Sequence, residues 1–278
     1  MLAAAENPWG LDLWILRSAM EGRHLGGNKA YKLQGYLARA RHEGFSHLIT
    51  MAGPHSNHLR AFAAITRREG LIGTAIIRGD ELADHSRHSD EIRFAHECGV
   101  RLIFAPRQIY RALRETSTAA ERAVLVPDLD FKQAIFVPEG GLGTEALMGV
   151  ARWAKQATGF DTIFLPCATG ATCAGFLAAT TAPTQIHGVA VLRNFPAVNA
   201  AIAALVPQAA QRFALIEDYA TGRFGGAVDI GAEAGEFARV NGLVVDGIYT
   251  ARLLSALHDR ARAGHIRGRT LLVYTYNE

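Results

Sequence analysis

The chain has 278 residues, of which 49% are hydrophobic and 20% charged, a composition typical of a globular protein with a substantial core. Its net charge of +3 comes from 29 basic and 26 acidic side chains, too small and too dispersed an excess to indicate nucleic-acid binding. Three cysteines without metal-binding spacing favour a reducing cytoplasm, and the sequence predicts neither a signal peptide nor a membrane-spanning run.

The first half of the chain alternates short apolar runs with amphipathic segments. A predicted strand at 11–16 is followed by a glycine pair and by a helix from Lys29 to Glu43. The elements predicted next are a strand at 46–53, a helix at 58–70, a strand at 72–79, a helix at 89–99 with Ser89 as its N-cap, a strand at 100–106 and a helix from Gln108. This repeated β–α–β pattern predicts a parallel sheet covered by helices on both faces.

The chain changes character between Lys132 and Gly143, where Pro138 and several glycines interrupt the pattern. Beyond that point we predict a helix at 144–157, a strand at 161–166, a glycine loop with a helix behind it, and a strand at 186–192. We therefore expect two domains: residues 1–29 with 138–278 form a large cofactor-binding domain, and residues 30–137 form a small α/β domain.

Three loops share one design, in which a strand ends, a turn rich in Gly or Ser follows, and a helix begins. They read "MAGPHSNH", "PCATGATCAG" and "FVPEGGLGT". Ligands of open parallel sheets bind at the carboxyl ends of strands, where helix N-termini attract anions. The loop from Ala168 to Thr172 offers two hydroxyls and a glycine to a phosphate. It lacks the spacing of a dinucleotide fingerprint or a P-loop, so a plain turn between strand and helix explains it equally well.

The polar residues of the other loops have simpler explanations when each is taken alone. Ser56 and Asn57 are suited to cap a helix, which requires no function. His55 and His58 lack a third ligand, and the histidines in "HSRHS" lack an acidic ligand set, so we predict no metal site.

Lys29 stands directly behind Gly26, Gly27 and Asn28. Either it is an ordinary surface cation at a helix start, or the glycines clear space around its amine. The combination of this lysine with a Ser-Asn loop and a hydroxyl-rich loop on one α/β chain favours the second interpretation.

The stretches "GGNKAYKL", "AGPHSNH", "IIRGDEL", "PEGG", "CATGATCAG" and "DGIYT" resemble, in order and spacing, the family of D-cysteine desulfhydrases and 1-aminocyclopropane-1-carboxylate deaminases. The resemblance runs from about Leu11 to Thr275. Members of this family are fold-type II pyridoxal-phosphate enzymes related to the tryptophan synthase β subunit. The resemblance implies a two-domain, three-layer α/β fold with parallel-rich sheets and pyridoxal 5'-phosphate in the cleft.

The resemblance also implies roles for individual residues. Lys29 resembles the lysine that bonds covalently to the cofactor, and Asn57 resembles the hydrogen-bond partner of the 3′ oxygen of its pyridine ring. Ser56, Asn57 and His58 resemble the loop that holds the substrate carboxylate, with Ser56 also a candidate proton carrier. Tyr249 resembles the family's tyrosine near the substrate.

The cofactor's phosphate and ring nitrogen are assigned in the same way. The residues that resemble the phosphate cradle are Ala168, Thr169, Gly170, Ala171 and Thr172. Thr275 falls where the desulfhydrases place a threonine against the pyridine nitrogen. The implied activity is that of a lyase or deaminase of the D-cysteine desulfhydrase type, acting on a small amino acid by removal of the Cα proton and β-elimination to a 2-oxo acid and ammonia. A homodimer is also expected.

Two departures from the family pattern leave alternatives open. Thr250 stands where the cyclopropane deaminases carry Glu, which points away from cyclopropane ring opening. Tyr276 and Asn277 replace two family glycines, and Glu278 follows them. A family member with diverged chemistry, such as a racemase or a β-replacement enzyme, and a catalytically lost ligand-binding homologue therefore remain as alternatives.

Overall fold

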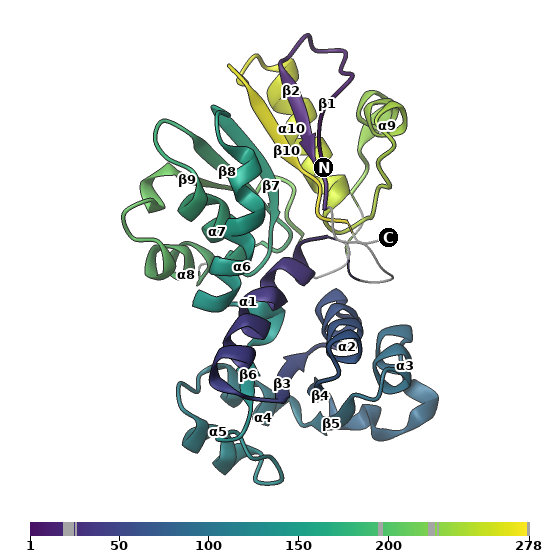
Figure 1. Ribbon diagram of the computed structural model, residues 1–278. Helices are drawn as coiled ribbons and strands as arrows, with labels where there is room; N and C mark the ends of the chain where they lie inside the picture. The colour runs from purple at the N-terminus through teal and green to yellow at the C-terminus, as the bar shows by residue number, and fades with distance from the viewer. Residues whose placement is uncertain (19–24, 26, 194–196, 222–225, 227, 277–278) are drawn as a thin grey trace. The chain divides into compact units, whose positions relative to one another are not determined.

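The computed structural model describes residues 1–18, 25, 27–193, 197–221, 226 and 228–276 (Figure 1). The chain divides into two compact units. The first unit comprises residues 1–20, 26–28 and 147–278, and the second comprises residues 21–25 and 29–146. Lys29 therefore belongs to the second unit, which extends to Ala146, beyond the boundary at Val137 that the sequence predicts.

Close backbone packing explains why the second unit continues past Val137. A side chain at Gly35 would begin 1.7 Å from the Glu145 carbonyl oxygen, so only glycine allows the two backbones to touch. The Tyr36 hydroxyl donates to the Leu142 carbonyl over 3.0 Å. The segment that follows Val137 is thereby held against the helix that carries Lys29.

The first unit is built on a six-stranded sheet with the order β1-β2-β10-β7-β8-β9. Its strands run parallel, except that β1 is antiparallel to β2. The strands are β1 (Leu2–Ala4), β2 (Leu13–Leu16), β7 (Thr162–Cys167), β8 (Gln185–Ala190), β9 (Phe213–Ile216) and β10 (Thr270–Val273). Its helices are α6 (Thr144–Ala154, which starts in the second unit), α7 (Ala171–Ala179), α8 (Ala197–Leu205), α9 (Gly231–Val240) and α10 (Thr250–Arg262).

Helices cover both faces of this sheet (Figure 1). One face packs on α9 and α10, where Phe237 and Leu253 join Phe164 and Leu272 of the strands in one buried cluster. On the other side, Trp153 of α6 meets Phe176 of α7 edge to face, with ring centres 5.4 Å apart. The first unit therefore has the three layers that the β–α–β pattern predicts.

The second unit has a four-stranded, fully parallel sheet with the order β5-β4-β3-β6. The strands are β3 (His47–Ala52), β4 (Ile72–Arg78), β5 (Arg101–Ala105) and β6 (Ile135–Val137). The helices are α1 (Gly27–Glu43, whose first two residues belong to the first unit), α2 (Asn57–Glu69), α3 (Asp90–Glu97), α4 (Arg107–Arg114) and α5 (Ala119–Leu125). A 3₁₀ turn, η3 (Glu139–Gly141), follows β6.

Most predicted elements lie within a few residues of the observed ones, and Ser89 is the N-cap of α3, as predicted. The sequence predicts a single helix from Gln108 onward, whereas the chain forms two helices there. The segment divides into α4 and α5 because Thr118 and Glu121 form a capping box that starts a new helix. Three observed strands, β1, β9 and β10, are not among the predicted elements. The three exposed residues of β1 carry no alternating pattern.

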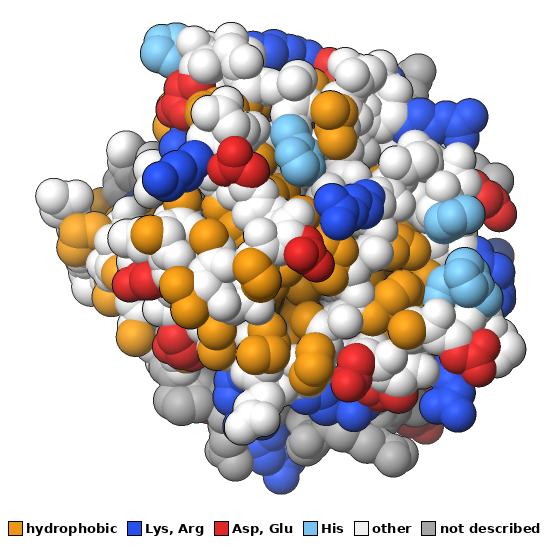
Figure 2. Space-filling model, turned by 90° about the horizontal axis from the view of Figure 1, so that it is seen from below, with side chains coloured by type: hydrophobic (Ala, Val, Ile, Leu, Met, Phe, Trp, Pro, Cys, Tyr) orange, Lys and Arg blue, Asp and Glu red, His pale blue; other side chains and the backbone are white. Residues whose placement is uncertain are grey.

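Charged side chains of both signs lie on one face of the molecule (Figure 2). On the face shown in Figure 2, Lys and Arg side chains alternate with Asp and Glu side chains, in keeping with the small net charge of +3. Among the described residues, no helix is both long and apolar enough to cross a bilayer.

Candidate active site

Lys29 is the third residue of α1, and its side chain is half-buried. Burial lowers the pKa of its amine from 10.5 to about 8, and a side-chain hydrogen bond with Lys32 opposes this shift. With a pKa of about 8, roughly a tenth of the amines are neutral at pH 7, against fewer than about one in a thousand for an ordinary lysine. Lys29 is therefore suited to act as a nucleophile or a base.

Lys32 lies one turn further along α1 and is only 2% exposed. Its amine donates to the Gly140 carbonyl over 3.0 Å. Gly141 has φ +69°, and a Cβ added there would lie 3.4 Å from the Lys32 Cβ. The glycines of η3 thus allow the backbone after β6 to approach the second buried lysine closely.

His58 is 1% exposed, and the positive charges of Lys29 and Lys32 act on its imidazole. Burial and the positive charges of Lys29 and Lys32 lower the pKa of its imidazole to about 3, so it is neutral at physiological pH. Thr50 donates its only hydroxyl proton to the Val137 carbonyl, over 2.9 Å. The 2.9 Å contact between Thr50 Oγ1 and His58 Nε2 therefore has Nε2–H as its donor, and Nδ1 carries the lone pair.

Ser56 and Asn57 begin the helix that carries His58. Ser56 is the N-cap of α2, and its hydroxyl oxygen accepts the His58 N–H over 3.2 Å. Asn57 is exposed. The loop before them is fixed from another side, because the Ser89 hydroxyl donates to the Pro54 carbonyl. The resemblance implies that Ser56, Asn57 and His58 hold the substrate carboxylate, but the His58 side chain contacts Thr50.

These residues meet at one edge of the small sheet. Strands β3 and β6 are parallel neighbours, so the loop before α2 and the glycines of η3 leave the sheet at the same edge. We call Lys29, Lys32, Ser56, Asn57 and His58 the Lys29 group; all five belong to the second unit.

The first unit presents a helix N-terminus suited to an anion. Gly170 is the N-cap of α7 with φ +83°, and within the described part of the chain no side chain caps it. The first intrahelical hydrogen bond runs from Ala174 N–H to Gly170 O, so the N–H groups of Ala171 and Thr172 point out of the helix end. This uncapped terminus fits a phosphate held by neutral groups, since the loop contains neither Lys nor Arg.

One hydrogen bond and one close backbone approach connect the start of α1 to the N-terminus of α7 and to Thr275. Asn28 Nδ2 donates to the Thr172 hydroxyl oxygen over 2.8 Å, which leaves the Thr172 hydroxyl proton for another acceptor. Gly27 has φ +68°, and a Cβ there would lie 2.5 Å from the Thr275 carbonyl oxygen. The space at Gly27 is therefore occupied by the backbone of Thr275. The sequence analysis instead interprets the glycine pair as clearing space around the Lys29 amine. Gly26 lies outside the described residues.

Strand order explains why Thr275 and the α7 loop lie at one edge. The chain passes from β7 to β8 and β9 in one direction, while β10 lies on the other side of β7. Ligands of open sheets bind where the order reverses in this way. We call Asn28, Ala168–Thr172 and Thr275 the α7 loop group; all belong to the first unit. Lys29 follows Asn28 directly along α1, so the chain itself links the two groups.

Tyr249 lies on a loop that two charged side chains hold in shape. One oxygen of Asp246 accepts the N–H groups of Ile248 and Tyr249, over 2.9 and 2.6 Å, and the other accepts the N–H and hydroxyl of Thr250. Arg252 is fully buried and donates to the Gly247 and Ile248 carbonyls over 2.7 and 2.6 Å. The same guanidinium donates to Thr221 and Gly226, which ties this loop to a second segment.

Burial of the Tyr249 phenol raises its pKa to about 12, with the Asp246 carboxylate as a second cause. The hydroxyl therefore stays protonated and can donate a hydrogen bond. The loop lies near the end of β10, because the Tyr274 hydroxyl donates to the Val244 carbonyl over 3.0 Å. Asn277 and Glu278, the departures at the chain end, lie outside the described residues.

Sequence reasoning missed Asn28, Lys32, Thr50, Asp246 and Arg252. For Lys32 a signal existed, since it stands three residues after Lys29 on the same helix face. Burial of Arg252 has no such signal, because an arginine in an amphipathic helix is normally solvated.

The chain was compared with known proteins, and no family model matches it. It is 24% identical over 286 residues to a Pyrococcus horikoshii protein provisionally named 1-aminocyclopropane-1-carboxylate deaminase, covering 96% of this chain and 84% of that one. It is 24% identical over 274 residues to the D-cysteine desulfhydrase of Salmonella paratyphi B, covering 90% of this chain and 81% of that one. These proteins are homologues of the chain.

Solved structures agree on the architecture. A homologue of 1-aminocyclopropane-1-carboxylate deaminase superposes with a TM-score of 0.73 at 22% identity, over 96% of this chain and 85% of that one. Maize serine racemase superposes with a TM-score of 0.61 at 12% identity, over 95% and 83%. The chain has the fold of the fold-type II pyridoxal-phosphate enzymes. At these identities the likeness establishes the fold alone.

Proposed function

We propose that the chain is a pyridoxal-phosphate-dependent lyase or deaminase acting on a small amino acid. The reaction removes the Cα proton and expels a substituent from Cβ, and hydrolysis then gives a 2-oxo acid and ammonia. The observation that carries this proposal is the half-buried Lys29 amine, whose pKa burial lowers to about 8. The names of the homologous desulfhydrases and deaminases support it.

Residues of both groups would hold the cofactor. The uncapped end of α7 and the Thr172 hydroxyl would bind the phosphate, and Lys29 would form the covalent bond. Asn57 and Thr275 would contact the 3′ oxygen and the nitrogen of the ring. When bound, pyridoxal phosphate supplies an electron sink for the carbanion at Cα.

The side chains near Lys29 favour a neutral amine that can carry the Cα proton. Lys29 takes the proton in its neutral form, which burial makes accessible near neutral pH. His58 is neutral and cannot compete as a cation, while its N–H is fixed on Thr50. Ser56 offers a hydroxyl at the start of α2 for the substrate carboxylate. Tyr249, protonated at all physiological pH values, offers a hydrogen-bond donor to the substrate.

The residues assigned to the ring nitrogen favour elimination over racemisation. Thr275 carries no charge, and the hydroxyl of Thr250 already donates to Asp246 over 2.5 Å. As a neutral partner, Thr275 would not hold a proton on the ring nitrogen, and the bound cofactor would then stabilise a Cα carbanion less. Prompt loss of a Cβ substituent is then favoured over reprotonation at Cα.

A titration of the purified, cofactor-loaded protein with D- and L-amino acids tests this function. We expect D-cysteine or another amino acid with a good leaving group on Cβ to yield pyruvate and ammonia, while alanine is not racemised. Fast racemisation of alanine would point to the racemase alternative, and transfer of a nucleophile to Cβ would point to β-replacement. Cofactor binding without turnover of any amino acid would identify a catalytically lost homologue.

The remaining expectations concern the molecule in the cell. We propose that the protein works in the cytoplasm as a homodimer on a small-molecule substrate, and that neither nucleic acid nor membrane is a partner. The net charge of only +3 and the mixed charges on the face shown in Figure 2 support the absence of a nucleic-acid partner. Sedimentation of the cofactor-loaded protein tests the oligomeric state.

A further inference from the structure

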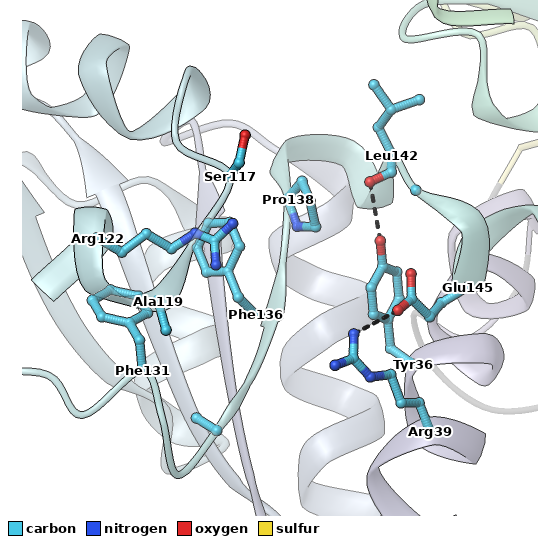
Figure 3. A pocket seen from close by; sticks show the side chains of 12 residues that line it. Tyr36, Arg39, Ser117, Ala119, Arg122, Phe131, Phe136, Pro138, Leu142 and Glu145 are labelled. Atoms are coloured by element: carbon cyan, nitrogen blue, oxygen red, sulfur yellow. Dashed lines mark hydrogen bonds and ion pairs between the residues drawn. The ribbon is translucent and has the colours of Figure 1, made fainter. Parts of the chain in front are cut away.

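A cavity lies within the second unit, and none of the residues assigned to the reaction lines it. Its volume is about 350 Å³, which suits a small molecule. One wall comes from α1 and the start of α6, and the opposite wall comes from α5 and β6 (Figure 3). The lining residues are Tyr36, Arg39, Ser117, Ala119, Arg122, Phe131, Ala134, Phe136, Pro138, Leu142, Gly143 and Glu145.

Arg122 is the unusual member of this lining. Its guanidinium carbon lies 4.2 Å from the centre of the Phe136 ring, and the two side chains overlap in Figure 3. Its Nε is buried without a hydrogen-bond partner among the described residues. One of its terminal nitrogens donates to the Thr116 carbonyl over 3.3 Å. Within the same part of the chain, no carboxylate lies at ion-pair distance from Arg122; the adjacent Glu121 accepts the N–H groups of Ser117 and Thr118 instead.

The polar side chains of the opposite wall already have partners within the chain. Arg39 pairs with Glu145 over 2.7 Å and with Glu43 over 2.8 Å. The Tyr36 hydroxyl donates to the Leu142 carbonyl. Of the two lining arginines, Arg122 is therefore the one without a carboxylate partner among the described residues, and Phe131, Phe136 and Pro138 supply apolar surface beside it.

We propose that this cavity binds a small monocarboxylic acid with an apolar body. The carboxylate would pair with Arg122, and the Ser117 hydroxyl would reach the same anion from the loop before α5. The apolar body would pack on the aromatic rings. A guanidinium that has no carboxylate partner and lies over an aromatic ring selects a planar anion, because its remaining donors match the two oxygens of a carboxylate.

The cavity is connected to the Lys29 group through the turn after β6. Pro138, Leu142 and Gly143 line the cavity, while Gly140, in the same turn, accepts the Lys32 amine over 3.0 Å. A ligand that fixes this turn acts on Lys32 and on its hydrogen bond with Lys29. We therefore expect the bound acid to change the affinity for pyridoxal phosphate, a consequence that rests on the proposed function.

Calorimetric titration with phenylacetate tests the site, with the neutral phenylacetamide as the matched ligand. Phenylacetate should bind with a millimolar or lower dissociation constant, as its size permits, and phenylacetamide should bind about tenfold or more weakly. Arg122→Gln should weaken phenylacetate binding by a similar factor, whereas Arg111→Gln, at an exposed position of α4, should not. Ala119→Phe should fill the cavity and abolish binding, while Ala120→Phe, one residue on and outside the lining, should preserve it.

Each result decides one part of the proposal. No binding of phenylacetate, or binding that survives both Arg122→Gln and Ala119→Phe, would overturn the site. The titration repeated with pyridoxal phosphate present should give a different dissociation constant, because coupling between two sites is reciprocal. An unchanged constant in cofactor-loaded protein would overturn the connection through η3. Failure of the protein to bind pyridoxal phosphate would contradict the proposed function and leave the site standing.

Discussion

Desolvation is the main cause that lowers the pKa of the Lys29 amine to about 8. Capture of a carbonyl cofactor requires the neutral amine. The rate at which the cofactor-free protein captures pyridoxal phosphate should therefore rise with pH, with a midpoint near 8. Stopped-flow absorbance measures this rate. A midpoint near 10.5, the ordinary lysine value, would show that burial does not activate the amine.

His58 should make the protein sensitive to mild acid. Its pKa of about 3 in the folded chain lies below the 6.5 of an exposed imidazole, so between these values the unfolded chain binds more protons. The free energy of unfolding should then fall as pH falls below 6.5, by up to ~1.4 kcal/mol per pH unit.

Denaturant unfolding of His58→Gln at several pH values measures this contribution. Glutamine can still donate to Thr50 but does not titrate, so the variant should lose part of the acid sensitivity. His42→Gln, at an exposed position of α1, is the matched control and should keep it. Identical pH profiles for the parent and His58→Gln would contradict the assignment.

At the scale of elements, the N-terminus of α7 should control the affinity for the cofactor. Thr172→Val removes the hydroxyl and leaves Asn28 Nδ2 without its acceptor. We expect cofactor affinity to fall about tenfold and the free energy of unfolding to fall by ~1–2 kcal/mol. Thr181→Val, at an exposed position beyond the other end of the helix, should change neither quantity. Unchanged affinity in Thr172→Val would move the phosphate to another loop, with "PEGGLG" the next candidate.

The clamp around Tyr249 is the second element that can be tested. Arg252→Lys keeps the charge but cannot reach the carbonyls of Gly247, Ile248 and Gly226 together. We expect a loss of ~2–4 kcal/mol in the free energy of unfolding, because buried acceptors lose a charged donor. Arg262→Lys, on the exposed end of the same helix, is the control and should cost less than ~1 kcal/mol. A loss in Arg252→Lys no larger than in this control would contradict the clamp.

At the scale of the whole molecule, sequence pattern predicts the order of elements well and their neighbours poorly. The turns before α2 and α7 were predictable because Ser56 and Gly170 are residues that start helices locally. The approach of Gly27 to Thr275 was not, since it depends on β10 returning beside β7 after more than a hundred intervening residues. Local preference cannot encode which distant strands become neighbours.

The residues of the candidate site also divide into those that the sequence marks locally and those that only the folded structure brings together. The sequence singles out Lys29, the Ser-Asn loop and the α7 loop, because glycines and polar residues mark them locally. It gives no sign that Arg252 is fully buried or that Asp246 accepts four hydrogen bonds. Those roles arise only when the segment before α10 folds back on the helix. The roles of individual residues toward the cofactor stay predictions.

Reduction with borohydride followed by peptide mapping tests the central claim most directly. The protein is loaded with pyridoxal phosphate, reduced, digested and analysed by mass spectrometry, which locates the trapped cofactor on one lysine. We predict that the cofactor is found on Lys29, that Lys29→Ala abolishes both trapping and the visible absorbance of the bound cofactor, and that Lys132→Ala, at an exposed position, changes neither. Trapping on Lys32, or visible absorbance that persists in Lys29→Ala, would contradict the account.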